Sequence, residues 1–441
     1  MRNRESVVRR DVLGWSLYDF ANTIYSMNIV SLYLKRYIVQ DLGFDDRYFD
    51  IPFSASMLCA AIVLPALGAL SDHSTKKKIF VFLFTLTCCM AVGLMAYVPP
   101  ALIWITIVLF VIANFSYEAA QPFYNALLYS VADGRQARFV SGIGVSFGYV
   151  GSVAGMILVL PFVTGELFSL NIPFIHAEGK VGAFLPTAIL FMLFALPLFA
   201  WVRESGIHIP RKINFLNSYR EVWQALRQTR KYPGVLRFLI ADYFFEDTVT
   251  TVILNIGLYS SIVIGLDDSQ ITLFLIISTV SAVFGSLILG KVAEYRSLKH
   301  LLAWIMIGWV IALALFVVAS NMVVIWILGS VVGVLLGGLW TTSRPMLAEM
   351  VPREELGKFF GLFALSGRAA AVVGPLVWTT VVYLFRPERV LGRYMTELFN
   401  LEVVSATRLP YKMGVISLII MLLIGLIIFR KVPHSRQVTH G

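Results

Sequence analysis

The chain has 441 residues, of which 58% are hydrophobic and only 14% are Asp, Glu, Lys or Arg. A soluble globule of this length needs far more polar surface, so the composition excludes a soluble protein and indicates one that is embedded in a lipid bilayer. The net charge of +10 does not indicate a nucleic-acid partner, because the cations are distributed as in a membrane protein.

Twelve apolar runs are long enough to predict helices that cross a membrane. A crossing helix needs about 20 mostly apolar residues. The runs that satisfy this requirement cover residues 12–38, 50–71, 79–98, 101–130, 139–163, 183–202, 236–264, 270–290, 301–320, 322–347, 357–385 and 411–430. The fifth run is rich in glycine, and small residues four apart in it predict close packing against another helix, at Gly142, Gly144, Gly148, Gly151 and Gly155.

Two copies of one short pattern indicate that the chain is duplicated. Residues 68–78 and 290–300 lie 222 residues apart. In each segment a glycine comes four residues before a carboxylate, and a cation comes five residues after that carboxylate. Two further pairs keep nearly the same offset, namely Pro122 with Pro345 and Ser141 with Ser366. The sequence therefore predicts an all-α membrane protein of two six-helix halves, residues 1–202 and 236–441, joined by a linker over residues 203–235.

The distribution of cations predicts the orientation in the membrane. With a cytoplasmic N-terminus, most cations fall in the inner segments: Arg2, Arg4, Arg9, Arg10, Lys76, Lys77, Lys78, Arg135, Arg138, Lys291, Arg296, Lys299, Arg353, Lys358, Arg430, Lys431, Arg436 and those of the linker. This positive-inside bias, with twelve spans, places both termini in the cytoplasm. The length and the short tails are typical of a bacterial inner-membrane protein. The outer loops are poor in cations except over residues 386–412, a long loop to which no pattern assigns a role.

The linker contains an amphipathic pattern. Its apolar residues recur at helical spacing, at Phe215, Tyr219, Val222, Trp223 and Leu226. Its cations take the other side, at Arg220, Arg227, Arg230 and Lys231. Two interpretations are open: a helix that lies on the inner leaflet, or a plain tether between the halves.

Ionisable residues inside the predicted spans indicate a polar cavity. Such groups are costly at bilayer depth and usually face a bundle interior or a water-filled cavity. The third, sixth, ninth and twelfth spans carry none in their apolar cores, whereas the first, fourth, seventh, tenth and eleventh carry Asp19, Glu118, Asp242, Glu246, Asp247, Arg344 and Arg368. From a rise of ~1.5 Å per residue, Asp247 and Arg368 are each expected about 15 Å from the cytoplasmic end of their helix, and Asp19 at roughly 14 Å.

Arg368 has two interpretations. It pairs with Asp247 or Glu246 to hold two helices together, or it binds the carboxylate of a solute while an acidic residue binds the solute's amine or takes up a proton. We favour the second interpretation, because a single arginine is outnumbered by carboxylates at its level.

The repeated pattern at 68–78 and 290–300 predicts a gate on the cytoplasmic face. Carboxylates at helix ends can pair with neighbouring cations and close that face when the halves rock together. The candidate gating residues are Gly68, Asp72, Lys76, Lys77, Gly290, Glu294, Lys299 and Arg344. The alternative is a tight cation-rich turn with no gating role.

These residues resemble a known superfamily. Gly68, Leu70 and Asp72 with the following lysines are similar to the signature hairpin of major facilitator transporters. Further segments resemble the vacuole-effluxer family, which includes amino-acid exporters of yeast vacuoles: Gly14 to Asn22, Phe123-Tyr124-Asn125, Ser141 to Gly151, Ser343-Arg344, and Ser366-Gly367-Arg368 to Pro375. The chain departs from that pattern at Thr248, Trp340, Tyr129 and Pro345.

The resemblance implies the major facilitator fold and transport by alternating access. With it, the candidate substrate-binding residues are Asp19, Asn22, Glu118, Asn125, Glu246, Asp247, Trp340 and Arg368. The expected function is secondary transport of a small polar metabolite, with amino acids favoured, coupled to protons through the surplus of carboxylates. The alternative is efflux of amphipathic drugs or lipids, which the aromatic content of 13% supports.

An enzyme is not expected. The six histidines all fall in loops or tails, no metal-ligand cluster is evident, and the absence of a Walker pattern argues against ATP as energy source. We therefore expect no cofactor and no metal. The expected partners are the solute, protons and the lipid bilayer, with the protein acting as a monomer.

Overall fold

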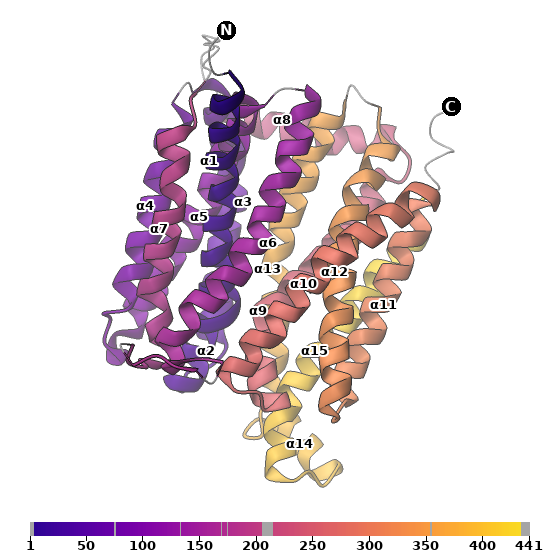
Figure 1. Ribbon diagram of the computed structural model, residues 1–441. Helices are drawn as coiled ribbons and strands as arrows, with labels where there is room; N and C mark the ends of the chain where they lie inside the picture. The colour runs from indigo at the N-terminus through magenta and orange to yellow at the C-terminus, as the bar shows by residue number, and fades with distance from the viewer. Residues whose placement is uncertain are drawn as a thin grey trace. The chain divides into compact units, whose positions relative to one another are not determined.

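The computed structural model describes residues 4–74, 76–132, 134–168, 170–173, 175–204, 215–352 and 355–433. The chain divides into two units: Met1–Phe44 with Ala55–Tyr219, and Asp45–Ser54 with Arg220–Gly441. The helical elements in each unit can be followed in Figure 1 by their labels. Each unit is described by itself below.

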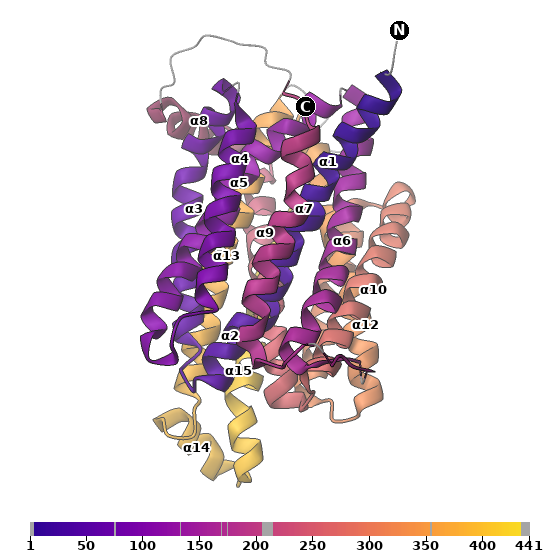
Figure 2. The ribbon, with the colours of Figure 1, turned by 60° about the vertical axis from the view of Figure 1, so that its left-hand side comes forward.

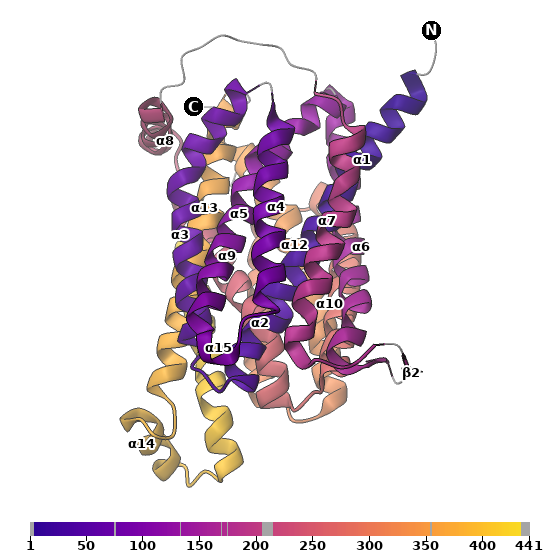
Figure 3. The same ribbon diagram turned by 90° about the vertical axis from the view of Figure 1, so that its left-hand side faces the viewer.

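The first unit contains six long helical stretches and one small hairpin. Its elements in order are α1 (Arg4–Tyr25), η1 (Ser26–Tyr33), α2 (Leu34–Arg36), η2 (Tyr37–Asp41), α3 (Arg47–His73), α4 (Lys77–Met95), η3 (Pro100–Leu102), α5 (Ile103–Val131), α6 (Gly134–Thr164), β1 (Glu166–Leu167), β2 (Leu170–Asn171), η4 (Gly179–Ala183) and α7 (Phe184–Trp201). The start of α3, up to Ser54, belongs to the second unit. The two strands pair antiparallel beyond the end of α6, where Figure 3 labels β2. Helices α4, α5 and α7 lie side by side, as Figure 2 also shows.

The second unit repeats the arrangement of long helices. Its elements in order are α8 (Phe215–Gln228), η5 (Thr229–Lys231), α9 (Val235–Tyr259), η6 (Ser260–Ile264), α10 (Asp268–Tyr295), α11 (Leu298–Val318), α12 (Met322–Met350), α13 (Leu356–Leu384), α14 (Val390–Leu398) and α15 (Val403–Arg430). The boundary between the two units falls inside α8, between Tyr219 and Arg220. The short helix α14 connects α13 to α15 and lies beyond the end of α13 (Figure 1).

Eleven helices in the described part of the chain are long and apolar enough to cross a membrane. They correspond to the second to twelfth predicted spans. The predicted first span, 12–38, is helical throughout, but it is not among the eleven. Six of the 22 residues of α1 are charged, and the wide π turns of η1 and η2 follow it. This stretch is therefore the most polar of the long helical segments in the first unit.

The glycines of α6 allow it to pack directly on α1. A Cβ atom at Gly151 would lie 2.2 Å from the Phe20 carbonyl oxygen, and one at Gly144 would lie 2.5 Å from Asp19 Oδ2. At Gly155 the nearest atoms, of Ile24 and Asn28, would be 3.1 Å away. Such approaches exclude any larger residue unless the helices separate, so the predicted close packing is confirmed and its partner is α1.

The start of α3 is held in the second unit by a charged cluster. Arg386, just beyond α13, forms an ion pair with Asp45 at 3.1 Å and approaches the fully buried Asp46 at 3.8 Å. Asp46 also accepts a hydrogen bond from the Tyr411 hydroxyl at 3.2 Å. The Tyr383 ring lies against two guanidinium groups, those of Arg47 and Arg389, at 3.9 and 4.0 Å from its centroid.

This cluster gives two of the cations of the 386–412 loop a structural role. Arg386 and Arg389 neutralise acids and cover an aromatic ring within the second unit.

Candidate solute-binding site

Three carboxylates on α9 are directed toward two different helices. Asp242 and Glu246 are four residues apart and share one side of α9, whereas Asp247 lies about 100° further around the helix. Glu246 contacts α12 and Asp247 contacts α13. The acidic cluster seen in the sequence is therefore divided into two chemically distinct positions.

Asp247 is fixed by the backbone of α13. Its Oδ1 atom accepts a hydrogen bond of 2.7 Å from the Gly374 N–H, and its side chain is fully buried. A Cβ atom at Gly374 would lie 2.5 Å from Oδ1 and 2.2 Å from Thr251 Oγ1. Only glycine permits this approach. Within the described part of the chain Asp247 Oδ2 has no hydrogen-bond partner, so one oxygen of this buried carboxylate is available for a proton or a ligand.

The position of Asp247 differs from the expected one. The estimate from helix lengths placed Asp247 at the level of Arg368, but its hydrogen bond places it beside Gly374. Arg368 is six residues earlier on α13, which corresponds to about 9 Å along the helix. Counting from helix ends is inaccurate here because the two helices do not begin at equal depth.

Glu246 and Trp340 form a second, more accessible pair. The Trp340 indole N–H donates to Glu246 Oε2 at 3.2 Å, and 42% of Trp340 is exposed. Glu246 itself is half-buried, in contrast to Asp242 and Asp247. Arg344 is exposed one turn further along α12. The pair therefore combines a negative charge with an aromatic face, which is a suitable combination for an organic cation.

Arg368 is half-buried on α13. Its Nη1 atom donates to the Ala364 carbonyl oxygen at 3.3 Å, one turn earlier on the same helix. This contact orients the guanidinium group along α13. A role of Arg368 in solute binding stays a prediction.

In the first unit, Asp19 lies where α1 meets α6. It is half-buried and accepts a hydrogen bond from Asn22 Nδ2 at 3.4 Å. The adjacent Thr23 hydroxyl donates to the Gly148 carbonyl oxygen of α6 at 2.8 Å. The close approach of Gly144 to Asp19 described above holds the carboxylate against α6, so this acid is positioned by packing as well as by hydrogen bonds.

An aromatic stack positions α1 against α5. The rings of Trp15 and Tyr124 stack at 4.8 Å, and each side chain donates to the backbone carbonyl oxygen of the other residue, at 3.2 and 3.1 Å. On α5, Glu118 is half-buried and Asn125 is exposed. They are seven residues apart and so share one face of this helix.

The structure brings the candidate gating lysines into contacts within their own units. Lys77 Nζ donates to the Ser74 carbonyl oxygen at 2.9 Å, whereas Lys76 is exposed. Lys299 Nζ donates to the carbonyl oxygens of Arg430 and Val432 at the end of α15. The lysine next to the predicted pair, Lys78, makes the corresponding contact in the first unit, with the Val202 carbonyl oxygen at 2.7 Å.

The remaining gating candidates have fewer described contacts. A Cβ at Gly290 would lie 3.0 Å from Thr341, whereas one at Gly68 would meet nothing within 4 Å. Glu294 and Arg344 are exposed. The side chain of Asp72 lies outside the described residues. A gating role for this set stays a prediction.

Sequence reasoning missed several residues that the fold makes important. Gly374 was not singled out as an Asp247 partner, although a Gly-Pro pair inside an apolar helix was a usable signal. Lys35 and Arg36 are not among the ionisable residues named above inside the predicted spans, although each is only 2% exposed. Their signal was the long apolar run that precedes them without a break.

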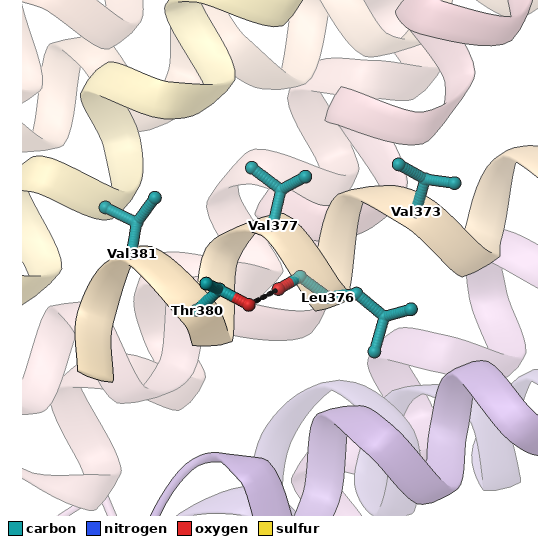
Figure 4. Close-up of a pocket in the computed structure, with 5 residues that line it drawn as sticks. All are labelled: Val373, Leu376, Val377, Thr380 and Val381. Atoms are coloured by element: carbon teal, nitrogen blue, oxygen red, sulfur yellow. Dashed lines mark hydrogen bonds between the residues drawn. The ribbon is translucent and has the colours of Figure 1, made fainter. Parts of the chain in front are cut away.

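A shallow groove runs along α13 and has no charged lining. Its volume is about 270 Å³, and Val373, Leu376, Val377, Thr380 and Val381 line it (Figure 4). The Thr380 hydroxyl is occupied by a hydrogen bond of 2.7 Å to the Leu376 carbonyl oxygen. The groove contains none of the candidate residues, and its surface suits an apolar group.

Comparison with known proteins identifies the relatives of this chain. Residues 129–384 match the family described as vacuole effluxer Atg22 like, and residues 2–156 match the major facilitator superfamily. An uncharacterized MFS-type transporter of Bacillus subtilis, YxiO, is 27% identical over 96% of this chain and 94% of its own length. Autophagy-related protein 22 of Kluyveromyces lactis is 22% identical over 84% of this chain and 87% of its own length.

Solved structures share the fold at low sequence identity. A bacterial homolog of the human lysosomal transporter Spinster has a TM-score of 0.71 at 14% identity, and it covers 99% of this chain and 97% of its own. The nucleoside transporter NupG has a TM-score of 0.70 at 14% identity, and it covers 95% of this chain and 99% of its own.

Proposed function

Because the chain belongs to the vacuole effluxer Atg22-like family and is a multi-pass major facilitator transporter, we propose that it moves a small polar metabolite, with amino acids as the substrate class. Transport would proceed by alternating access and would be coupled to protons. Family membership supports transport of a small-molecule solute, and the chemistry of α9, α12 and α13 supports the choice of solute.

The observation that carries the proposal is that Glu246 and Asp247 have different contacts and different accessibility. Asp247 is buried and held by the Gly374 N–H, whereas Glu246 is more accessible and accepts a hydrogen bond from the Trp340 indole N–H. Glu246 with Trp340 would bind the ammonium group of an amino acid. Arg368, which precedes Gly374 by six residues and so by about 9 Å along α13, would bind its carboxylate. Asp247, with one oxygen free of hydrogen bonds, would carry the proton.

The test is counterflow in liposomes that contain the purified protein. A mixture of labelled amino acids should exchange, and a proton gradient should change the rate of net uptake. In an Arg368→Gln variant that folds as the original protein does, exchange should be largely lost. Arg393→Gln, which removes an exposed cation of α14, is the matched control and should exchange normally. Undiminished exchange by Arg368→Gln would exclude the carboxylate-binding role.

A second candidate function is efflux of amphipathic drugs or lipids. The groove along α13 favours it, because its lining from Val373 to Val381 is apolar and uncharged. An amphipathic substrate would place its apolar part there. Transport of an amphipathic dye, together with no amino-acid counterflow from the same folded preparation, would replace the first proposal by this one.

We also propose that the protein is a monomer in a bacterial inner membrane with both termini in the cytoplasm. The relative from Bacillus subtilis supports a bacterial membrane, and the positive-inside pattern supports the orientation; the monomeric state stays a prediction. Labelling of single cysteines introduced near residues 76 and 393 with an impermeant reagent in intact cells tests the orientation. Only the cysteine near residue 393 should react.

A further inference from the structure

Helix α8 presents three different faces. Ala225 is buried and, with the buried Thr229 of the adjoining turn η5, holds the helix to the protein. Tyr219, Trp223 and Leu226 form a second face, here called the apolar stripe, and they are 43%, 54% and 37% exposed. Arg220 and Arg227, seven residues apart, share a third face of α8 beside the apolar stripe. Together with Lys231 of the adjoining turn η5 they are here called the basic edge.

The apolar stripe begins beside a surface that faces lipid. The Tyr219 hydroxyl donates to the Ile62 carbonyl oxygen of α3 at 2.9 Å, and both residues belong to the first unit. The Ile62 side chain is 55% exposed and lies in the apolar span that ends at Gly68. Six residues separate Ile62 from that end, which corresponds to about 9 Å along the helix. The start of α8 is therefore level with membrane-embedded residues of α3 rather than with bulk water.

The charge of α8 matches an anionic surface. Residues 219–231 contain four cations, Arg220, Arg227, Arg230 and Lys231, and one acid, Glu221, so their net charge is +3. The Arg227 guanidinium lies 5.3 Å from the Trp223 ring, so the basic edge and the apolar stripe are in contact. In helices that lie in a membrane interface, the apolar face enters the acyl boundary and the cations reach the headgroups.

We propose that α8 is an interfacial helix whose basic edge binds the headgroups of anionic phospholipids while its apolar stripe lies among their acyl chains. The occupant is a lipid surface rather than a protein, because Tyr219, at which the stripe begins, is hydrogen-bonded to Ile62 within an apolar span of α3. The headgroup is anionic because the basic edge carries three cations and no acid. This site is separate from the solute site and does not depend on which solute is carried.

The experiment measures tryptophan quenching by lipids that carry bromine on their acyl chains. The full-length protein is reconstituted in vesicles of phosphatidylcholine with a minority of phosphatidylglycerol, and the bromine is placed on one lipid or on the other in equal molar amount. The difference between the original protein and its Trp223→Phe variant isolates the signal of Trp223. A second pair of samples carries Arg220→Gln, Arg227→Gln and Lys231→Gln together, with and without Trp223→Phe.

Two results are expected. The Trp223 signal should be quenched by brominated lipid, and brominated phosphatidylglycerol should quench it at least about twofold more than the same amount of brominated phosphatidylcholine. Removal of the basic edge should abolish this preference and leave quenching by phosphatidylcholine. A control that removes three exposed cations elsewhere, at Lys291, Arg296 and Arg393, should keep the preference.

Either of two other results would overturn the proposal. Absence of quenching at Trp223 by both lipids would mean that protein, such as a second copy of the chain, covers the apolar stripe. Equal quenching by both lipids in the original protein would mean that α8 lies in the membrane without recognising headgroup charge. The triple variant is tested for counterflow and for elution as a single species, so that misfolding is not read as lost lipid binding.

Discussion

Lys78 and Lys299 make equivalent contacts in the two units. The Lys78 ammonium group donates to the carbonyl oxygen of Val202, just after α7, and that of Lys299 donates to the carbonyl oxygen of Val432, just after α15. The two lysines are 221 residues apart, close to the offset of the repeated pattern. In each unit a lysine of the repeated segment donates to a backbone carbonyl oxygen at the carboxyl end of the last long helix, where carbonyl groups lack partners within the helix.

Lys78→Met and Lys299→Met should each destabilise the protein. Loss of a charged donor at a helix end costs on the order of 1 kcal/mol, which should lower the apparent Tm by about 2 °C. Thermal unfolding of the purified protein in detergent measures the change. The exposed Lys76 makes no comparable contact with a helix end, so Lys76→Met should leave the Tm unchanged; an equal loss there would indicate a general charge effect.

Gly374→Ala should disturb the contact between α9 and α13. The added methyl group would overlap both Asp247 Oδ1 and Thr251 Oγ1, and relief of such overpacking costs about 1–3 kcal/mol. We expect a lower Tm and a loss of transport. Gly367→Ala is the matched control on the same helix, because a Cβ there meets nothing within 4 Å. A Gly374→Ala protein as stable and active as the control would contradict the proposed geometry.

Gly151→Ala should separate α6 from α1. Its Cβ would lie 2.2 Å from the Phe20 carbonyl oxygen, whereas a Cβ at Gly142 of the same helix would meet nothing within 4 Å. The cost at Gly151 should be about 1–3 kcal/mol and should appear as a lower Tm and poorer yield. Gly142→Ala should be neutral or slightly stabilising, since alanine favours helix.

Arg386→Gln should leave a buried acid without its cation. Asp46 is fully buried, so loss of its charged neighbour leaves a charge that is costly in an apolar environment. Because Arg386 is partly exposed to solvent, we expect a loss of about 2 kcal/mol rather than the full cost of breaking a buried pair. Arg386→Gln combined with Asp46→Asn should recover part of the lost Tm; no recovery would show that the pair does not contribute.

Glu246→Gln should weaken solute binding rather than folding. The glutamine amide can still accept from the Trp340 indole at 3.2 Å, but it carries no charge for an ammonium group. The KM for amino-acid counterflow should rise about tenfold or more, the loss expected for a charged hydrogen bond. The Tm should be unchanged. An unchanged KM would remove Glu246 from the substrate site.

The fold class could be predicted from sequence because its causes are local. The length and polarity of each apolar run decide whether it crosses a bilayer, and the repeat at 68–78 and 290–300 displays the duplication directly. Eleven predicted spans correspond to helices that can cross a membrane, and the major facilitator fold is confirmed. The 12–38 segment is the difficult one, since charged residues enter α1 and π turns follow it.

The candidate site could be predicted only as a set of residue types at approximate depths. The sequence by itself determined that α9 would carry three carboxylates within six residues, 242–247. Only the tertiary structure decided that Glu246 meets Trp340 while Asp247 meets the Gly374 N–H. The physical reason is that membrane depth and helix periodicity follow from the order of residues along one helix. The partner of each side chain depends instead on how two helices approach, and here a missing side chain at Gly374 makes that approach possible.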